Sequence, residues 1–270
     1  MIALASAARL HRYLPHVTGA ALAEARIQEE QMVCFTRTIT AGGAGMAVYE
    51  VLPEGAQRCP AIVVIQHAPG VDRFLHRMAD RLAEAGYAAV APDLYHRLDP
   101  TREAMERFRL LKDREVEEDV NAVVDYLQRH PRVDSARLGV TGFCMGGRVT
   151  YLMAAANPHF KAAVAYYGGN IMVPWGDDVV APFARSAEIH CPLMFHAGAE
   201  DTNPAPQDLQ QFDAELSRLG KPHEFYSYSG AGHAFMNFTS AERYRESADQ
   251  ASWPRTLEFF ARHLRPDRSS

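Results

Sequence analysis

The feature that most constrains the fold of this chain is a repeated alternation between short apolar strands and amphipathic helices. The run AIVVIQ at 61–66 is apolar up to its final glutamine, as expected of a strand that is buried on both faces of a sheet. The next segment, 71–87, has apolar residues at helical spacing and ends near Gly86. Further strands are expected at 88–95, 137–142, 161–169 (with the following loop), 192–198 and 223–230, and further helices at 114–130, 144–157, 206–220 and 241–264.

Three segments modify this alternation. The runs 33–40 and 45–52 alternate in polarity around a glycine-rich turn, which indicates an opening β-hairpin. Residues 170–190 contain prolines and Trp175 without clear periodicity, and we expect a loop or small lid over a site. The last helix contains Pro254, where we expect a break. The pattern as a whole predicts an α/β fold with a mostly parallel, doubly wound sheet, opened by the hairpin and covered by helices on both faces.

Composition and charge exclude several classes of function. The 270 residues carry a net charge of −5 and no basic stripe, which argues against a nucleic-acid partner. No apolar run approaches the ~18 residues that span a bilayer, and no secretion signal is recognised, so we expect a cytoplasmic protein without membrane association. None of the four cysteines belongs to a C-x-x-C pair, which argues against zinc and dithiol redox sites.

The length and composition fit a single domain. We expect this domain over 32–270, preceded by an extension over 1–31 that is either helical or disordered. Met32 is an alternative start, because the first clear strand begins just after it. The sequence leaves the oligomeric state open.

The motif GFCMGG at 142–147 is the strongest functional signal in the chain. It joins an expected strand to an expected helix and places Cys144 at the tip of the turn, in the pattern G-x-C-x-G. Gly142 and Gly146 would remove the collisions that side chains cause in such a sharp turn. A thiol at a helix N-terminus has a lowered pKa, and the backbone N–H of Met145 would point towards a developing oxyanion. The alternative is a buried structural cysteine beside packing glycines.

A cysteine nucleophile requires a base, and the base requires an orienting acid. Asp201 follows the expected strand 192–198, and His233 follows the expected strand 223–230, so both belong to loops at the carboxyl ends of strands. Glu200 is the fallback acid. Taken singly, Asp201 is explained as a turn residue and His233 as an exposed loop histidine. The order nucleophile, acid, histidine on three successive sites favours a catalytic triad.

At these residues the chain resembles the dienelactone hydrolase family of α/β-hydrolases. The matching motifs span from about residue 61 to the final helix and comprise GFCMGG, APDLYHR, EEDVNAVVDYL, HAGAEDTNPAP and SGAGHAF. The resemblance implies the α/β-hydrolase fold and a triad of Cys144, His233 and Asp201. It also implies hydrolysis of a small ester or lactone through an acyl-enzyme, without a metal or an organic cofactor.

Two positions depart from the pattern that this family suggests. The family has a glutamate after the glutamine of the 61–66 strand, where this chain has His67. Its lactone-specific members have an arginine for the substrate carboxylate four residues past the histidine, where this chain has Asn237. Both departures weigh against a dienelactone carboxylate as the substrate. His67 either lines the site, by contacting Cys144 or by holding the loop whose Ala68 N–H is a second oxyanion donor, or it caps the next helix.

Other side chains are weaker candidates for contact with the substrate. Tyr95 and Arg97 end a strand at the expected active face, where Arg97 would bind an anionic substrate or form a surface ion pair. Arg148 is expected to pair with a nearby acid. Four aromatic residues would form the wall of an apolar acyl pocket or would pack in the core: Phe143, Tyr167, Trp175 and Phe235.

Two other functions remain open from the sequence. A thiol sensor or a binding protein on the same fold would use an accessible, low-pKa Cys144 without turnover. Such a protein needs no base on another loop, so His233 and Asp201 favour the enzyme. A hydrolase of larger acyl groups or of short peptides is the other alternative, if the 170–190 segment admits them.

Overall fold

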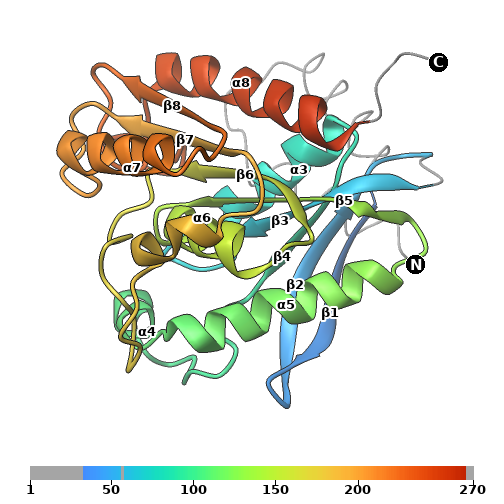
Figure 1. Cartoon of the computed structure of the whole chain (residues 1–270). Helices are drawn as coiled ribbons and strands as arrows, with labels where there is room; N and C mark the ends of the chain where they lie inside the picture. The colour runs from blue at the N-terminus through green and yellow to red at the C-terminus, as the bar shows by residue number, and fades with distance from the viewer. Residues whose placement is uncertain (1–32, 56–57, 266–270) are drawn as a thin grey trace.

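The computed structural model describes residues 33–55 and 58–265, which form one mostly parallel sheet between two layers of helices (Figure 1). The strand order is β1-β2-β4-β3-β5-β6-β7-β8, and the first two strands pair antiparallel with their neighbours. The remaining strands are parallel. The strand bounds are β1 Val33–Ala41, β2 Ala44–Leu52, β3 Cys59–Ile65, β4 Ala88–Pro92, β5 Val133–Phe143, β6 Phe160–Tyr166, β7 Leu193–Gly198 and β8 His223–Tyr228. The predicted fold class, including the opening hairpin, is confirmed.

The helices lie on both faces of the sheet, as predicted. Their bounds are α3 Arg73–Glu84, α4 Ala104–Arg109, α5 Asp113–Arg129, α6 Met145–Ala156, the 3₁₀ segment η1 Pro182–Glu188, α7 Pro206–Arg218 and α8 Glu246–Leu264. Helices α3 and α8 cover one face, and α5, α6 and α7 cover the other. Strand β3 is continuously apolar because both of its faces are buried. Val63 packs in the core on one side of the sheet, and its neighbours Ile62 and Val64 pack in the core on the other side.

The closing helix differs from the sequence prediction. Helix α8 begins at Glu246 and continues through Pro254 without a break. The buried face of the helix explains this, because Trp253 and Phe259 pack in the core and Thr256 hydrogen-bonds two side chains of the sheet. Tertiary packing therefore outweighs the local cost of the proline.

Three smaller differences concern loops and termini. The short helix α4 was not expected, and the strand predicted over 88–95 ends at Pro92. Segment 170–190 is a loop whose regular structure is the 3₁₀ segment η1. The predicted N-terminal extension, 1–31, lies outside the described residues. Within 33–55 and 58–265, no helix is long and apolar enough to cross a membrane.

The topology gathers the candidate site at one edge of the sheet. Strands β5, β6, β7 and β8 are adjacent and parallel, so the loops that follow them leave at the same edge. Those loops begin at Cys144, Tyr167, Ala199 and Ser229. The segments that contain the predicted nucleophile, acid and base are therefore neighbours in space although they are distant in sequence.

Candidate active site

Cys144 lies in a strained turn between β5 and α6. Its backbone angles are φ 57° and ψ −118°, which non-glycine residues adopt rarely and at a cost. The turn is held from both sides, because the Cys144 N–H donates to the carbonyl of Tyr166 at 3.1 Å and its carbonyl accepts from the N–H of Gly147 at 2.9 Å. The backbone therefore fixes the thiol at the N-terminus of α6.

The glycines on either side of Cys144 permit this turn, as the sequence predicted. A Cβ at Gly142 would lie 2.2 Å from the carbonyl oxygen of Gly146. A Cβ at Gly146 would lie 2.4 Å from the carbonyl oxygen of Ile65 in β3. Because both obstacles are backbone atoms, a side chain at either position would displace the helix from the sheet.

His233 and Asp201 are brought together by the loops after β8 and β7. The imidazole Nδ1 lies 2.8 Å from Oδ2 of Asp201. The carboxylate side chain is 1% exposed and its other oxygen accepts from the N–H of Asn203 at 2.9 Å, whereas the imidazole is 30% exposed. The Asp201 carboxylate is therefore buried and held in place, whereas the His233 imidazole is partly exposed. With Nδ1 bound to Asp201, Nε2 is the ring nitrogen left to interact with the Cys144 thiol, whose pKa His233 lowers.

The ionisation of this Cys–His–Asp array departs from that of isolated side chains. Burial tends to raise the pKa of the Cys144 thiol, but the hydrogen bond and positive charge of His233, together with two backbone N–H groups, lower it. Burial tends to lower the pKa of His233, yet hydrogen bonds to Asp201 and Cys144 and their negative charges raise it to about 10. The lowered thiol pKa and the raised imidazole pKa both shift this pair towards thiolate and imidazolium.

The two N–H groups that hydrogen-bond the sulfur belong to Met145 and Ala68, the two residues predicted to form the oxyanion hole. Tyr95 organises this pair. Its buried hydroxyl donates to the carbonyl of Ala68 at 2.7 Å and lies 3.4 Å from the sulfur of Met145. Tyr95 therefore supports the oxyanion loop from behind.

His67 lies behind the oxyanion loop and faces the start of α3. Its Nε2 is 2.9 Å from Oδ1 of Asp72, and the imidazole is 6% exposed. Asp72 is the N-cap of α3 and accepts from the N–H of Leu75 at 3.1 Å. Burial tends to raise the pKa of Asp72, but the hydrogen bond and charge of His67 have a larger opposite effect, so the pKa of Asp72 is lowered. Of the predicted roles, this geometry fits a tether between the oxyanion loop and the helix cap.

Three predicted substrate contacts have partners within the protein. The guanidinium of Arg97 pairs with Asp119 and, at 3.0 Å, with Glu118. Asn237 forms a local turn in which its Oδ1 accepts from the N–H and hydroxyl of Thr239 at 3.1 and 2.6 Å. Trp175 stacks over the guanidinium of Arg148 at 3.8 Å. For Arg97, the structure therefore shows the ion-pair alternative.

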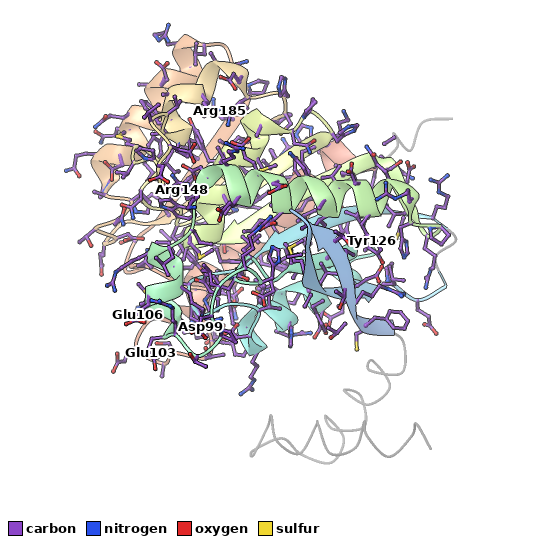
Figure 2. The ribbon with its side chains drawn as sticks, turned by 90° about the horizontal axis from the view of Figure 1, so that it is seen from below. Asp99, Glu103, Glu106, Tyr126, Arg148 and Arg185 are labelled. Carbon is purple, nitrogen blue, oxygen red and sulfur yellow. The ribbon has the colours of Figure 1, made fainter. Side chains whose placement is uncertain are left out.

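Arg148 pairs with a nearby acid, as predicted, and fixes the loop that contains Trp175. Its guanidinium is fully buried, binds both oxygens of Asp113 and donates from Nε to the carbonyl of Asn170 at 3.0 Å. Figure 2 shows Arg148 beside the N-terminal end of α5, with Tyr126 towards the other end of that helix.

The other aromatic candidates divide between core and site. Phe143 is buried between Phe74, at 5.0 Å, and Tyr166, at 4.9 Å, and therefore packs in the core. The Tyr167 ring lies 5.3 Å from the imidazole of His233 and 5.1 Å from the ring of Phe235. Tyr167 is therefore the aromatic residue that borders the Cys–His–Asp array, with Phe235 behind it.

A hollow near this edge escaped the sequence analysis because it depends on α4. It has a volume of about 280 Å³, and its lining includes Phe108, Arg109, Leu111, Val173, Pro174 and Trp175. Large apolar side chains are exposed on the same two segments, at Met105, Leu110, Val173, Val179 and Val180. Figure 2 places the acidic residues Asp99, Glu103 and Glu106 at α4 and in the segment just before it.

A second feature missed from the sequence is the side chain of Asn203. Its Oδ1 accepts from the N–H of Asn170 at 3.0 Å, and its Nδ2 donates to the Asn170 side chain at 3.2 Å. Asn203 thereby joins the loop of Asp201 to the loop that contains Trp175. Across the described ranges, no group of three or more His, Cys, Asp or Glu side chains is arranged to hold a metal ion.

Comparison with known proteins agrees with this geometry. Residues 46–264 match the dienelactone hydrolase family. A Bradyrhizobium sp. protein named "Probable 2-oxo-3-(5-oxofuran-2-ylidene)propanoate lactonase" is 33% identical over 234 residues, 84% of this chain and 93% of the relative. A Salmonella typhimurium protein with the provisional name carboxymethylenebutenolidase is 31% identical, over 84% of this chain and 86% of its own length.

A solved structure extends the likeness to three dimensions. The crystal structure of a provisionally named dienelactone hydrolase from Klebsiella pneumoniae superposes with a TM-score of 0.78 at 31% identity. The superposition covers 86% of this chain and 99% of that one. Sequence, fold and the arrangement at the edge of the sheet lead to one assignment: the chain belongs to the dienelactone hydrolase family.

Proposed function

We propose that this protein is a cysteine-dependent hydrolase of small esters or lactones, acting through Cys144, His233 and Asp201. The observation that supports this most directly is the hydrogen-bonded array itself. Cys144 lies in a strained turn, the imidazole of His233 lies 2.8 Å from a buried carboxylate, and His233 together with the N–H groups of Met145 and Ala68 lowers the pKa of the thiol. The names of the relatives, a lactonase and a carboxymethylenebutenolidase, support the class of reaction.

In the acylation step, the Cys144 thiolate attacks the carbonyl carbon and a carbon–sulfur bond forms. The carbonyl oxygen becomes negative and accepts hydrogen bonds from the N–H groups of Met145 and Ala68. As the tetrahedral intermediate collapses, the carbon–oxygen bond of the ester breaks, and the imidazolium of His233 gives its proton to the leaving oxygen. The products are the alcohol or enol and a thioester on Cys144.

The electrostatics of the array explain how His233 changes from acid to base. In the resting protein its raised pKa depends partly on the hydrogen bond and negative charge of Cys144. A thioester has no such charge. After acylation, only Asp201 still raises the pKa of His233 against the lowering effect of burial, so the imidazole pKa falls. Neutral His233 then accepts a proton from water, which attacks the thioester, and departure of the thiolate restores the starting pair.

The substrate class is inferred from the two positions at which the sequence suggested a partner for a substrate carboxylate. Arg97 is engaged with Asp119 and Glu118, and the neutral Asn237 is engaged with Thr239. We therefore assign esters and lactones without a dienelactone-type carboxylate as substrates. An apolar acyl or aryl arm of moderate length would lie in the hollow between α4 and the loop of Trp175.

The substrate assignment predicts a specific activity profile. Neutral aryl esters and enol lactones should be hydrolysed with a higher kcat/KM than cis-dienelactone, because Arg97 and Asn237 are engaged by other side chains and a buried carboxylate without a partner is costly. The measurement is a panel of lactones, aryl esters and thioesters with acyl chains of increasing length. A wide preference for cis-dienelactone would contradict the assignment of neutral substrates and leave the Cys–His–Asp mechanism intact.

The ion pair predicts an unusual pH profile for alkylation of Cys144. The second-order rate with iodoacetamide should reach its plateau at a lower pH than that of an ordinary thiol, because the thiol pKa is lowered. In Asp201→Asn the carboxylate no longer stabilises the imidazolium, so the midpoint should move to higher pH, towards that of an ordinary thiol.

A Cys34→Ser background keeps this measurement specific, because Cys34 is exposed whereas Cys59 and Cys191 are buried. An unchanged midpoint in Asp201→Asn would show that this carboxylate does not support the pair. Mass spectrometry of the alkylated peptide confirms which sulfur has reacted.

A further inference from the structure

Tyr167 has two unusual properties at the same position. Its φ angle is 38°, in the left-handed region that a bulky side chain seldom adopts. Its side chain is buried, and its hydroxyl has no hydrogen-bond partner within the described part of the chain. A buried, unpartnered hydroxyl is costly, so its presence next to a reactive group indicates a function.

The backbone holds Tyr167 in this conformation from the sheet side. It directly follows β6, and its N–H donates to the carbonyl of His196 in β7 at 2.7 Å. The side chain consequently faces the loop of His233, with the two rings 5.3 Å apart in an edge-to-face arrangement. The strained residue therefore presents its ring to the base of the array.

The surroundings of the Tyr167 hydroxyl leave it free to donate a hydrogen bond. None of the described groups is placed to donate a hydrogen bond to the phenolic oxygen or to accept the phenolic proton. Burial, followed by the negative charge of Cys144, raises the pKa of Tyr167 well above its ordinary value, so the hydroxyl keeps its proton at neutral pH. The geometric link between Tyr167 and the array is the contact of its ring with the imidazole of His233.

On the basis of the proposed function, the geometry points to Tyr167 as a further catalytic residue that donates a hydrogen bond to the departing oxygen of the ester. The carbonyl oxygen already has the N–H groups of Met145 and Ala68 as donors. The departing oxygen must approach His233 to receive its proton, and the Tyr167 ring borders that imidazole. The proton that completes the alcohol comes from His233, and Tyr167 retains its own proton throughout.

The adjacent tyrosine offers a matched control. Tyr166 is also buried, but its hydroxyl bonds Thr256 at 2.6 Å on the α8 side of the sheet. Tyr167→Phe removes a hydroxyl without a protein partner, so its Tm should equal or exceed that of the wild type. Tyr166→Phe leaves the hydroxyl of Thr256 with one partner fewer, so its Tm should fall.

The decisive experiment measures kcat/KM for esters of one acid with leaving groups of graded basicity, from nitrophenyl to alkyl. In Tyr167→Phe we expect a loss of about 10- to 100-fold on alkyl esters, the worth of a hydrogen bond to a charged oxygen, and less than about 2-fold on nitrophenyl esters, so the dependence on leaving-group pKa steepens. In Tyr166→Phe the dependence should match that of the wild type.

An unchanged dependence in Tyr167→Phe, or equal losses on every ester, overturns the role of Tyr167 while the proposed hydrolysis stands. Absence of Cys144-dependent turnover in the wild type overturns the proposed function and the role of Tyr167 together.

Discussion

Replacing Cys144 with alanine should abolish turnover of aryl acetates, with a fall in kcat of about 10⁴-fold or more. In the proposed mechanism the substitution removes the atom that forms the acyl-enzyme, and neither His233 nor Asp201 supplies another nucleophile at the turn. His233→Ala should have a loss of similar order, because one imidazole both stabilises the thiolate and transfers the proton. Since these residues act as a unit, the double variant should be hardly slower than either single variant.

Cys191→Ala is the matched control for the thiol. Cys191 is buried, and burial raises its pKa to about 12, so its removal should leave kcat unchanged. Steady turnover that persists in Cys144→Ala would refute the proposed mechanism. A single burst of product from the wild type without further turnover would instead favour a thiol sensor, the alternative that the sequence leaves open.

The second large effect is on stability, at the ion pair between Arg148 and Asp113. Asp113→Ala would leave a fully buried guanidinium without its carboxylate, and breaking a buried pair in this way typically costs about 3–5 kcal/mol in the free energy of unfolding. Urea denaturation followed by circular dichroism measures the loss. The loop of Trp175 should loosen as well, because Asp113 also accepts from the Trp175 N–H at 2.9 Å.

Glu115→Ala on the same helix is the control for this prediction. Glu115 pairs with Lys112 at the surface, so its removal should shift the urea midpoint little. A variant that removes both charges, Asp113→Ala with Arg148→Met, should recover part of the lost stability, because no buried charge is left unpaired. Equal stability of Asp113→Ala and the wild type would show that the pair is not needed.

The part of the site that the sequence predicted is the part fixed by backbone geometry. Gly142 and Gly146 around Cys144 indicate a sharp turn. A Cβ at either position would collide with a backbone carbonyl oxygen, which explains why glycine is needed there. Asp201 and His233 were predictable because each follows a strand, and parallel strands deliver their loops to one edge.

The remaining features depend on side-chain partners that are distant in sequence. Arg97 lies at the predicted active edge, yet acids on α5 engage it, and nothing in the sequence near residue 97 indicates them. His67 likewise faces Asp72 because of the path of one short loop. Pro254 is tolerated because its helix is packed on both sides of the proline, which local propensity does not register. The unpartnered hydroxyl of Tyr167 required the folded arrangement to be seen at all.

The contrast between the glycine-lined turn and the apolar rim bears on how such a protein diversifies. At Gly142 and Gly146 the backbone packs directly against backbone, so any side chain introduced there would clash. The turn that positions Cys144 should therefore change little as the sequence diverges. The rim formed by α4 and the loop up to Val180 has exposed side chains with room around them. Divergence in specificity should therefore accumulate on the rim, and libraries intended to retarget the enzyme belong there.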